Sequence, residues 1–359
     1  MDKVSGDLRI VSASGTYDRM GYEVGQECTE LARELLRLAR VRLKEKSIAW
    51  DKALATSSKF LPYAEDYDPE LCEFLRGYAE GSGQSFNDLF VHFCFDEKGF
   101  CTDVSVNDTV TADGSVLSAH SEDWSPIYDG CVVMVKGRPK NGPSFMSLGL
   151  CGLEFDCGMN SAGLSFSGNS LYHNDMRIGI PRMFVSRRIL ASRNIAEAIT
   201  ASVPDKRASS YNHNLCHVDG DIFCVEGSAT DFAAIPGDEG YLVHTNHYLS
   251  PSMAKYETIF QGPGGNSPEN GIGSLTRYHR ARGLLRRHLG EVTVDTLESI
   301  MSDHANHPAS ICCHSDESKP LEERGETIFA VIFDLVGSRM LVCPGNPCES
   351  GFQEYMLEP

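Results

Sequence analysis

The spacing of apolar residues changes near residue 100 of this 359-residue chain. Before that point, apolar side chains recur every three or four residues, which is the spacing of one helix face. We expect helices over residues 22–46 and 51–60, another after Pro69, and a fourth that Ser85 caps and that runs through Phe93. The first hundred residues are therefore predicted to be nearly all helical.

From Cys101 onward the period becomes two, which is typical of strands. On the first expected strand, Thr102, Val104 and Val106 point to one side, and Cys101, Asp103 and Ser105 point to the other. Further strands are expected over residues 115–119, 131–136, 144–150, 163–167, 221–226, 240–245, 327–335 and 338–342. Helices are expected over residues 181–191, 194–202, 275–289 and 294–304. Strands interrupted by blocks of helices predict an α+β fold built in layers.

The charge of the chain limits its partners. The formal net charge is −18 and the pI is about 5.1, so we expect neither nucleic acid nor an anionic membrane as a partner. The same acidity is compatible with a small cationic substrate. Five arginines near the last two helices are expected to form a solvated face: Arg277, Arg280, Arg282, Arg286 and Arg287.

Thirteen cysteines are present, an odd number. The first residues carry no apolar core of a signal peptide, and no later run is long enough to span a membrane. We therefore expect a cytoplasmic protein with reduced thiols, most of them packed as small hydrophobic side chains.

Histidines and cysteines also gather in three groups that resemble zinc ligands in residue type. The groups are His213, Cys216 and His217; His304, His307, Cys312, Cys313 and His314; and Cys343 with Cys348. None has a paired Cys-x-x-Cys arrangement, and acidic or aromatic neighbours interrupt each group. We expect no metal and no cofactor.

Cys101 is the most informative residue because it lies where the helical part meets the strands. Cleavage of the Phe100–Cys101 bond would place a free α-amine beside the thiol. Such an amine has an ordinary pKa of roughly 7.7–8.0 and could act as a general base for its own side chain. The alternative from the residues alone is an ordinary buried strand cysteine.

Several short motifs, in this order, resemble the isopenicillin N acyltransferase family of N-terminal nucleophile hydrolases, which includes the insect β-alanyl-dopamine hydrolase. The motifs are Gly21-Tyr22-Glu23-Val24-Gly25, Cys101-Thr102, Ser121-Glu122-Asp123-Trp124, Gly158-Met159-Asn160-Ser161-Ala162-Gly163-Leu164, Val243-His244-Thr245-Asn246-His247 and Ser310-Ile311-Cys312. The resemblance implies a four-layer αββα sandwich made as one precursor. Self-cleavage would leave residues 1–100 and 101–359, which we expect to stay associated as one domain.

The resemblance also implies roles for single residues. Cys101 matches the nucleophile, and Asp123 matches the aspartate that holds its amine or thiol. Asn246 matches an oxyanion-hole amide, a type of donor worth about 2.7–4 kcal/mol in a transition state. Ser228 matches a serine of the substrate pocket. The alternatives for Asp123 and Asn246 are a turn-capping carboxylate and an ordinary loop amide.

Two residues depart from the family pattern. Phe100 stands where the family usually has glycine, with Gly99 one position earlier, so self-cleavage is expected to be slowed or altered. Cys313 stands where the family commonly has arginine, a rigid carboxylate binder. Its replacement favours a neutral or cationic amide over a penicillin-like carboxylate, with Cys313 in the pocket.

Two further residues are candidates for substrate binding. Asp103 shares a strand face with Cys101, and His120, three residues before Asp123, is expected near the same pocket. An ordinary strand histidine is the alternative for His120.

The predicted reaction is acyl transfer from a small amide through an acyl-thioester. Water would release an acid, and an amine or thiol acceptor would make the enzyme an acyltransferase. β-Alanyl or other aminoacyl amines are the favoured substrates, and acyl-CoA-dependent transfer to a β-lactam-like amine is the alternative. Two other hypotheses are an uncleaved papain-like hydrolase using His244 or His247, and an inactive relative that only binds.

Overall fold

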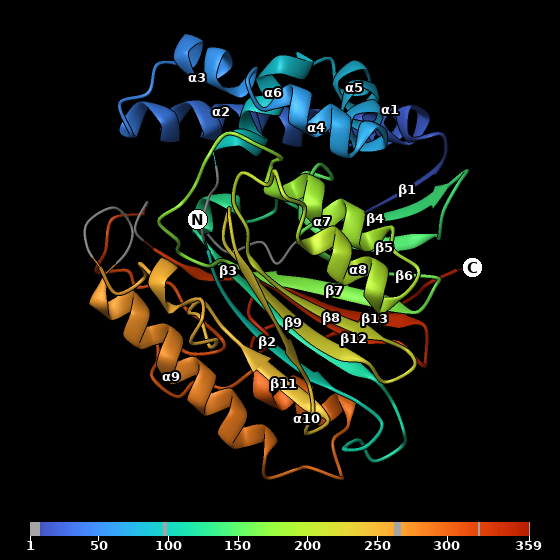
Figure 1. The fold of residues 1–359 in the computed structure, drawn as a ribbon, viewed down its shortest axis with the longest axis vertical. Coiled ribbons are helices and arrows are strands. Elements are labelled where there is room, and N and C mark those ends of the chain that lie inside the picture. Colours follow the sequence, from blue (N-terminus) through green and yellow to red (C-terminus); the bar gives the residue numbers. More distant parts are fainter. Residues whose placement is uncertain (1–7, 96–98, 262–266, 322–323, 359) are drawn as a thin grey trace.

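The computed structural model describes residues 8–95, 99–261, 267–321 and 324–358. Two β-sheets pack face to face, and helices cover the outer side of each sheet (Figure 1). The predicted α+β fold, a four-layer αββα sandwich, is confirmed. Within these residues, no helix has the length and apolar character required to cross a membrane.

One helical layer is formed mainly by the first hundred residues. Its helices are α1 (Tyr17–Glu27), α2 (Thr29–Glu45), α3 (Trp50–Ser57), α4 (Leu61–Tyr67), α5 (Pro69–Ser82) and α6 (Phe86–Cys94). The expectation of almost continuous helix was wrong at its start, because residues 9–15 form strand β1 (Arg9–Gly15). This strand pairs in parallel with β4 (Val132–Pro139), so both segments proposed to arise by cleavage contribute to one sheet.

The larger sheet has the strand order β1-β4-β5-β6-β7-β8-β9-β10. Its remaining strands are β5 (Phe145–Leu150), β6 (Cys157–Asn160), β7 (Leu164–Asn169), β8 (Asn212–His217), β9 (Ile222–Gly227) and β10 (Phe232–Pro236). Helices α7 (Arg182–Leu190) and α8 (Ile195–Ser202) pack on β6 to β9, beside the first helical layer (Figure 1).

The smaller sheet has the order β11-β2-β3-β12-β13-β14 and carries the proposed nucleophile. Its strands are β2 (Phe100–Val106), β3 (Leu117–Trp124), β11 (Tyr241–His244), β12 (Glu326–Asp334), β13 (Arg339–Pro344) and β14 (Gln353–Met356). Helices α9 (Pro268–Leu285) and α10 (Val294–Met301) cover its outer face.

The predicted alternation along β2 is confirmed by its contacts. Val104 and Val106 pack in an apolar cluster with residues of α9 and α10. On the other face, Asp103 accepts a hydrogen bond from Ser167 of β7, which belongs to the larger sheet. The Cys101 face of β2 is therefore turned toward the space between the two sheets.

The motif from Gly21 to Gly25 has a structural explanation. An added Cβ at Gly21 or Gly25 would collide with the backbone of α5 at Phe74 or Tyr78. Gly77 of α5 is equally close to the backbone of α1. These glycines let the two helices approach to backbone contact, so the motif serves the fold.

Candidate active site

The register of β2 and β3 brings four polar positions of the candidate site together. Cys101 lies opposite Glu122, and Asp103 lies opposite His120. Phe100, which opens β2, lies opposite Asp123. The expectation that Cys101 opens the first strand is corrected in two respects: it is the second residue of its strand, and β1 precedes that strand.

The Cys101 thiol is buried, with 1% of the residue exposed, and its Sγ lies 3.4 Å from Oε1 of Glu122. Burial raises the pKa of the thiol well above its ordinary value, and the Glu122 and Asp123 carboxylates raise it further. A backbone hydrogen bond from Ser170 acts in the opposite direction. The thiol therefore needs a base in order to react as a thiolate.

Asn246 lies directly beside the nucleophile, as the resemblance implied. Its Oδ1 accepts the Cys101 backbone N–H at 3.0 Å. Its Nδ2 donates to the Ser170 carbonyl at 3.2 Å and lies 3.5 Å from the Gly99 carbonyl. Ser274 fixes the backbone of this residue by accepting the Asn246 N–H at 2.8 Å. The side-chain amide thus spans the proposed cleavage point.

The expectation that Arg277 of α9 lies on a solvated face was wrong. Arg277 is 4% exposed, and its guanidinium donates to the Cys101 carbonyl at 2.6 Å and to Oδ1 of Asn246 at 2.8 Å. It also donates to the Thr102 hydroxyl at 2.8 Å. This side chain ties the strand of the nucleophile to the candidate oxyanion residue.

Asp123 of β3 lies opposite Phe100 and is held by Thr327. Its Oδ1 accepts a hydrogen bond from the Thr327 hydroxyl at 2.6 Å, and its buried Oδ2 has no hydrogen-bond partner among the described residues. Burial raises the pKa of this carboxyl to about 7, while the Arg277 charge acts in the opposite direction. The Thr327 hydroxyl also accepts the Cys313 N–H at 3.0 Å. Cys313 therefore lies close to Asp123, and its role in binding substrate stays a prediction.

His120 is part of a buried charged chain. Its Nδ1 lies 2.9 Å from Oδ1 of Asp103, and its Nε2 lies 3.1 Å from Oε2 of Glu122. Burial opposes a charge on the ring, but these two carboxylates overcome it and raise the pKa of His120 to about 10. The imidazolium is thus wedged between two carboxylates, one of which contacts the thiol. The predicted substrate-binding roles of His120 and Asp103 stay predictions.

The bulky Phe100 is accommodated. Its ring stacks on Tyr172 with centroids 6.2 Å apart, and the Arg277 guanidinium lies 5.8 Å from its centre. Gly99 has no such room, because an added Cβ would collide with the Trp124 ring. The close approach that requires glycine is thus one residue earlier than the family pattern suggests.

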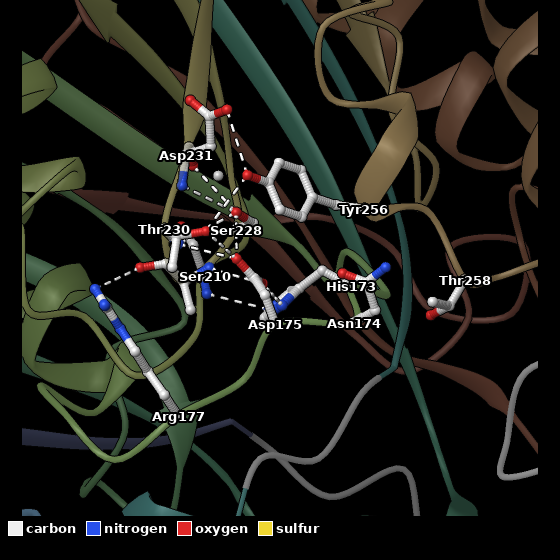
Figure 2. A network of polar contacts seen from close by, with 12 residues as sticks. His173, Asn174, Asp175, Arg177, Ser210, Ser228, Thr230, Asp231, Tyr256 and Thr258 are labelled. Carbon is white, nitrogen blue, oxygen red and sulfur yellow. Dashed lines mark hydrogen bonds and ion pairs between the residues drawn. The ribbon is translucent and has the colours of Figure 1, made fainter.

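Ser228 belongs to a separate polar network around Asp175 (Figure 2). Its hydroxyl donates to Oδ2 of Asp175 at 2.9 Å and accepts the Asp231 N–H at 3.0 Å. Asp175 also contacts Nδ1 of His173 at 2.7 Å. Among the described residues, no hydrogen bond links Ser228 to Cys101, and the predicted pocket role of Ser228 stays a prediction.

The histidines of the papain-like hypothesis have other partners. The ring nitrogens of His244 lie 2.8 Å from Glu226 and 2.7 Å from the Thr245 carbonyl. Nδ1 of His247 lies 2.8 Å from the Ser274 hydroxyl. Among the described residues, neither histidine makes a hydrogen bond to the Cys101 thiol.

Sequence reasoning missed three polar residues of the site. Glu122 is part of the Ser121–Trp124 motif, but its position opposite Cys101 follows only from the strand register. Arg277 had a readable signal, because it shares the buried face of α9 with Ser274, Ala281 and Leu285 at helical spacing. Thr327 had no signal, since it comes from a strand distant in the chain.

The αββα fold and the buried Cys101 on β2, the second strand of the smaller sheet, identify an enzyme of the acyltransferase and amidohydrolase class. A family model described as acyl-coenzyme A:6-aminopenicillanic acid acyl-transferase matches residues 110–349. The chain belongs to this family.

Individual relatives are distant. The 40 kDa form of acyl-coenzyme A:6-aminopenicillanic-acid-acyltransferase from Emericella nidulans is 24% identical over 289 residues, which cover 78% of this chain and 76% of that protein. Penicillin V acylase from Agrobacterium tumefaciens has a TM-score of 0.47 at 13% identity, covering 68% of this chain and 83% of that one. A mutant form of conjugated bile acid hydrolase from Clostridium perfringens has a TM-score of 0.49 at 12% identity, covering 72% of this chain and 97% of that one.

Proposed function

We propose that this protein is a self-cleaving cysteine amidohydrolase or acyltransferase that acts on small amides through an acyl-thioester on Cys101. One observation carries the proposal: the buried Cys101 has its backbone N–H on Asn246 and its thiol 3.4 Å from the Glu122 carboxylate. Both atoms that the chemistry requires, the nitrogen and the sulfur of one residue, thus have polar partners suited to it.

Maturation begins with the thiol. Glu122 takes the thiol proton, and Sγ attacks the carbonyl carbon of Phe100. The C–N bond to Cys101 then breaks, its nitrogen leaves as an amine with a proton returned by Glu122, and a thioester remains. Water hydrolyses the thioester to a Phe100 carboxylate and a free thiol. Residues 1–100 and 101–359 are the products.

The charges around Cys101 support cleavage. Asp103, Glu122 and Asp123 lie near the cations His120 and Arg277, and among the described residues one buried oxygen of Asp123 has no partner. A new α-ammonium would balance the remaining negative charge and supply the missing donor. The buried charges of the uncut chain would thus be better balanced after cleavage, when the α-ammonium is present.

In the cut enzyme, the neutral form of the Cys101 α-amine takes the thiol proton and becomes the α-ammonium, and the thiolate attacks the substrate amide carbonyl. Asn246 Nδ2, which lies 3.5 Å from the Gly99 carbonyl in the uncut chain, is the side-chain donor to the oxyanion. The leaving amine departs with a proton, and the thioester passes its acyl group to water or to another acceptor.

The net charge of −18 and Cys313 in place of the family's arginine suit a small cationic amide, so we favour β-alanyl or other aminoacyl amines. The second candidate is transfer from acyl-CoA to a β-lactam-like amine, which the name of the Emericella relative supports. We also infer a cytoplasmic location, which thirteen cysteines without a disulfide favour.

The first test is the intact mass of freshly purified protein beside a Cys101→Ala variant, with Cys94→Ser as a thiol control. Two fragments that meet between Phe100 and Cys101, absent only from Cys101→Ala, would support the proposal. A single chain in all three would refute self-cleavage and favour the binding relative or the uncleaved hydrolase.

The second test is substrate turnover by the mature protein. β-Alanyl amines, neutral acyl amines, and acyl-CoA with 6-aminopenicillanic acid are assayed side by side, with Cys101→Ala as the blank. Faster release from the cationic amides supports the favoured substrate class. If only the mixture of acyl-CoA and 6-aminopenicillanic acid is turned over, the second candidate function is supported. If no substrate is turned over, the favoured substrate class is refuted.

A further inference from the structure

Four side chains from three separate segments of the chain meet at one surface point. They are His304 after α10, Cys312 and His314 before β12, and Cys348 after β13, and their ligand atoms all lie within 4.8 Å of one another. Cys312 is buried, His314 is half-buried, and His304 and Cys348 are exposed. A metal ion could therefore enter from solvent and still be held partly inside the protein.

Four of the six distances between these atoms match those around a tetrahedral metal ion, and all six are within 4.8 Å. Nε2 of His314 lies 3.1 Å from Nε2 of His304, 3.4 Å from Sγ of Cys348 and 3.6 Å from Sγ of Cys312. The two sulfurs are 3.6 Å apart. Zn–S bonds of about 2.3 Å and Zn–N bonds of about 2.0–2.1 Å give ligand separations of about 3.8 Å for two sulfurs, about 3.6 Å for sulfur and nitrogen and about 3.3 Å for two nitrogens.

Two polar residues lie next to the four side chains. Nδ1 of His314 lies 3.8 Å from the Glu349 carboxylate, which is an ion-pair distance and too long for a hydrogen bond. Nδ2 of Asn346 lies 3.6 Å from Sγ of Cys312, where its N–H stabilises a thiolate, and it donates to the Cys313 carbonyl at 2.6 Å.

We propose that His304, Cys312, His314 and Cys348 bind one Zn²⁺ ion as a structural site. Two thiolates and two imidazoles in a tetrahedron form a closed set that is typical of structural zinc and leaves no position for substrate. The sequence expectation of no metal rested on spacing within each group of residues. The proposed ligands instead combine members of two groups.

This site would support the active site from a distance. Its ligands Cys312 and His314 flank Cys313, whose backbone N–H is bound by Thr327. The Thr327 hydroxyl in turn holds Asp123. Zinc would therefore fix the segment that positions Asp123 without touching the reacting atoms.

The test is the metal content of untagged protein, purified without chelator and measured by plasma mass spectrometry. We expect one zinc per chain, and Co²⁺ exchanged for zinc should show the strong visible absorption of a tetrahedral thiolate site. His304→Ala and Cys348→Ser, both at exposed positions, should lose the metal and lower Tm by more than about 5 °C.

Three control variants separate this site from other thiols and histidines. His288→Ala and Cys94→Ser should keep the metal. Cys101→Ala should also keep it, which matters because Cys101, His120 and Glu122 also approach one another closely. Loss of zinc in Cys101→Ala with retention in Cys348→Ser would overturn the proposal, whereas the proposed function rests on cleavage and turnover.

Two further results would overturn it. One is protein without metal that also fails to take up Zn²⁺ or Co²⁺ after reduction. The other is a Cys312–Cys348 disulfide in protein purified under nitrogen, detected as a mass two hydrogens lower and as protection from alkylation. Retained zinc in folded His304→Ala and Cys348→Ser would equally refute the ligand set.

Discussion

Nη2 of Arg277 lies 2.8 Å from Oδ1 of Asn246, and the same guanidinium reaches the Cys101 carbonyl. Because a guanidinium can only donate, it fixes which end of the Asn246 side chain is oxygen. Nδ2 is thereby left pointing at the carbonyls of Ser170 and Gly99. Arg277 is thus a positioning residue for the proposed oxyanion donor.

The first prediction concerns this contact. Arg277→Lys should slow self-cleavage about 10–100-fold, because an ammonium cannot reproduce the fork that holds two acceptors in place. The measurement is the fraction of cut chain against time, from intact mass. Arg280→Lys is the matched control, since Arg280 lies on the same helix but pairs with Asp303. Equal self-cleavage rates for Arg277→Lys and Arg280→Lys would mean that Arg277 does not position the site.

The second prediction concerns His120, tested in Cys101→Ala so that the chain stays uncut. His120→Asn should cost about 3–5 kcal/mol of unfolding free energy at pH 7, because Asp103 and Glu122 lose their shared cation. The folded pKa of about 10 lies above the ordinary 6.5. The stabilisation is therefore complete below pH 6.5 and is lost as pH rises through 10.

Urea unfolding of Cys101→Ala with and without His120→Asn measures this effect. The difference in unfolding free energy should shrink between pH 8 and pH 10, a window in which other groups titrate alike in both proteins. A constant difference across the window would mean that His120 is neutral in the folded chain.

The third prediction concerns Asp123, also in uncut Cys101→Ala. Its pKa is raised from 3.8 to about 7 by burial, so folding favours the protonated carboxyl. This contribution to stability is present below pH 3.8 and is lost as pH rises to 7. Asp123→Asn should therefore be increasingly more stable than its parent from pH 4 to pH 7. Urea unfolding at several pH values tests this, and an Asn variant that is less stable at pH 7 would contradict it.

The fourth prediction concerns the contact of α1 with α5. Gly25→Ala should destabilise the uncut chain by about 1–3 kcal/mol, because its methyl would meet the Tyr78 backbone. Gly273→Ala is the control, since a Cβ added to this helical glycine would meet no described atom within 4 Å apart from its chain neighbours and its own helix backbone. There, alanine should stabilise by up to about 1 kcal/mol. Thermal melts of both variants distinguish close packing from helix propensity.

Much of the fold follows from periodicity, and the exceptions have physical reasons. The expected helix over residues 22–46 is interrupted at Cys28, where the backbone turns between α1 and α2. Strand β1 escaped prediction because only Val11 and Ala13 of its seven residues are buried hydrophobics. An edge strand with this few buried side chains carries little alternation.

Site residues could be predicted from the sequence where a single motif identifies the residue and its role. Cys101 and Asn246 were named from their motifs, and the structure joins them by a hydrogen bond. Glu122 and Arg277 were missed because their parts depend on strand register and on helix packing. The proposed zinc ligands show the same limit, since their spacing becomes meaningful only after three loops have met.

The parallel pairing of β1 with β4 joins the two products of the proposed cleavage. Before the cut, refolding requires only the closure of a loop within one molecule. Afterward, two separate chains must find each other again, so recovery depends on concentration and competes with aggregation. The mature enzyme would then keep a fold that formed in the intact chain, and thermal unfolding of the two cut chains would be irreversible.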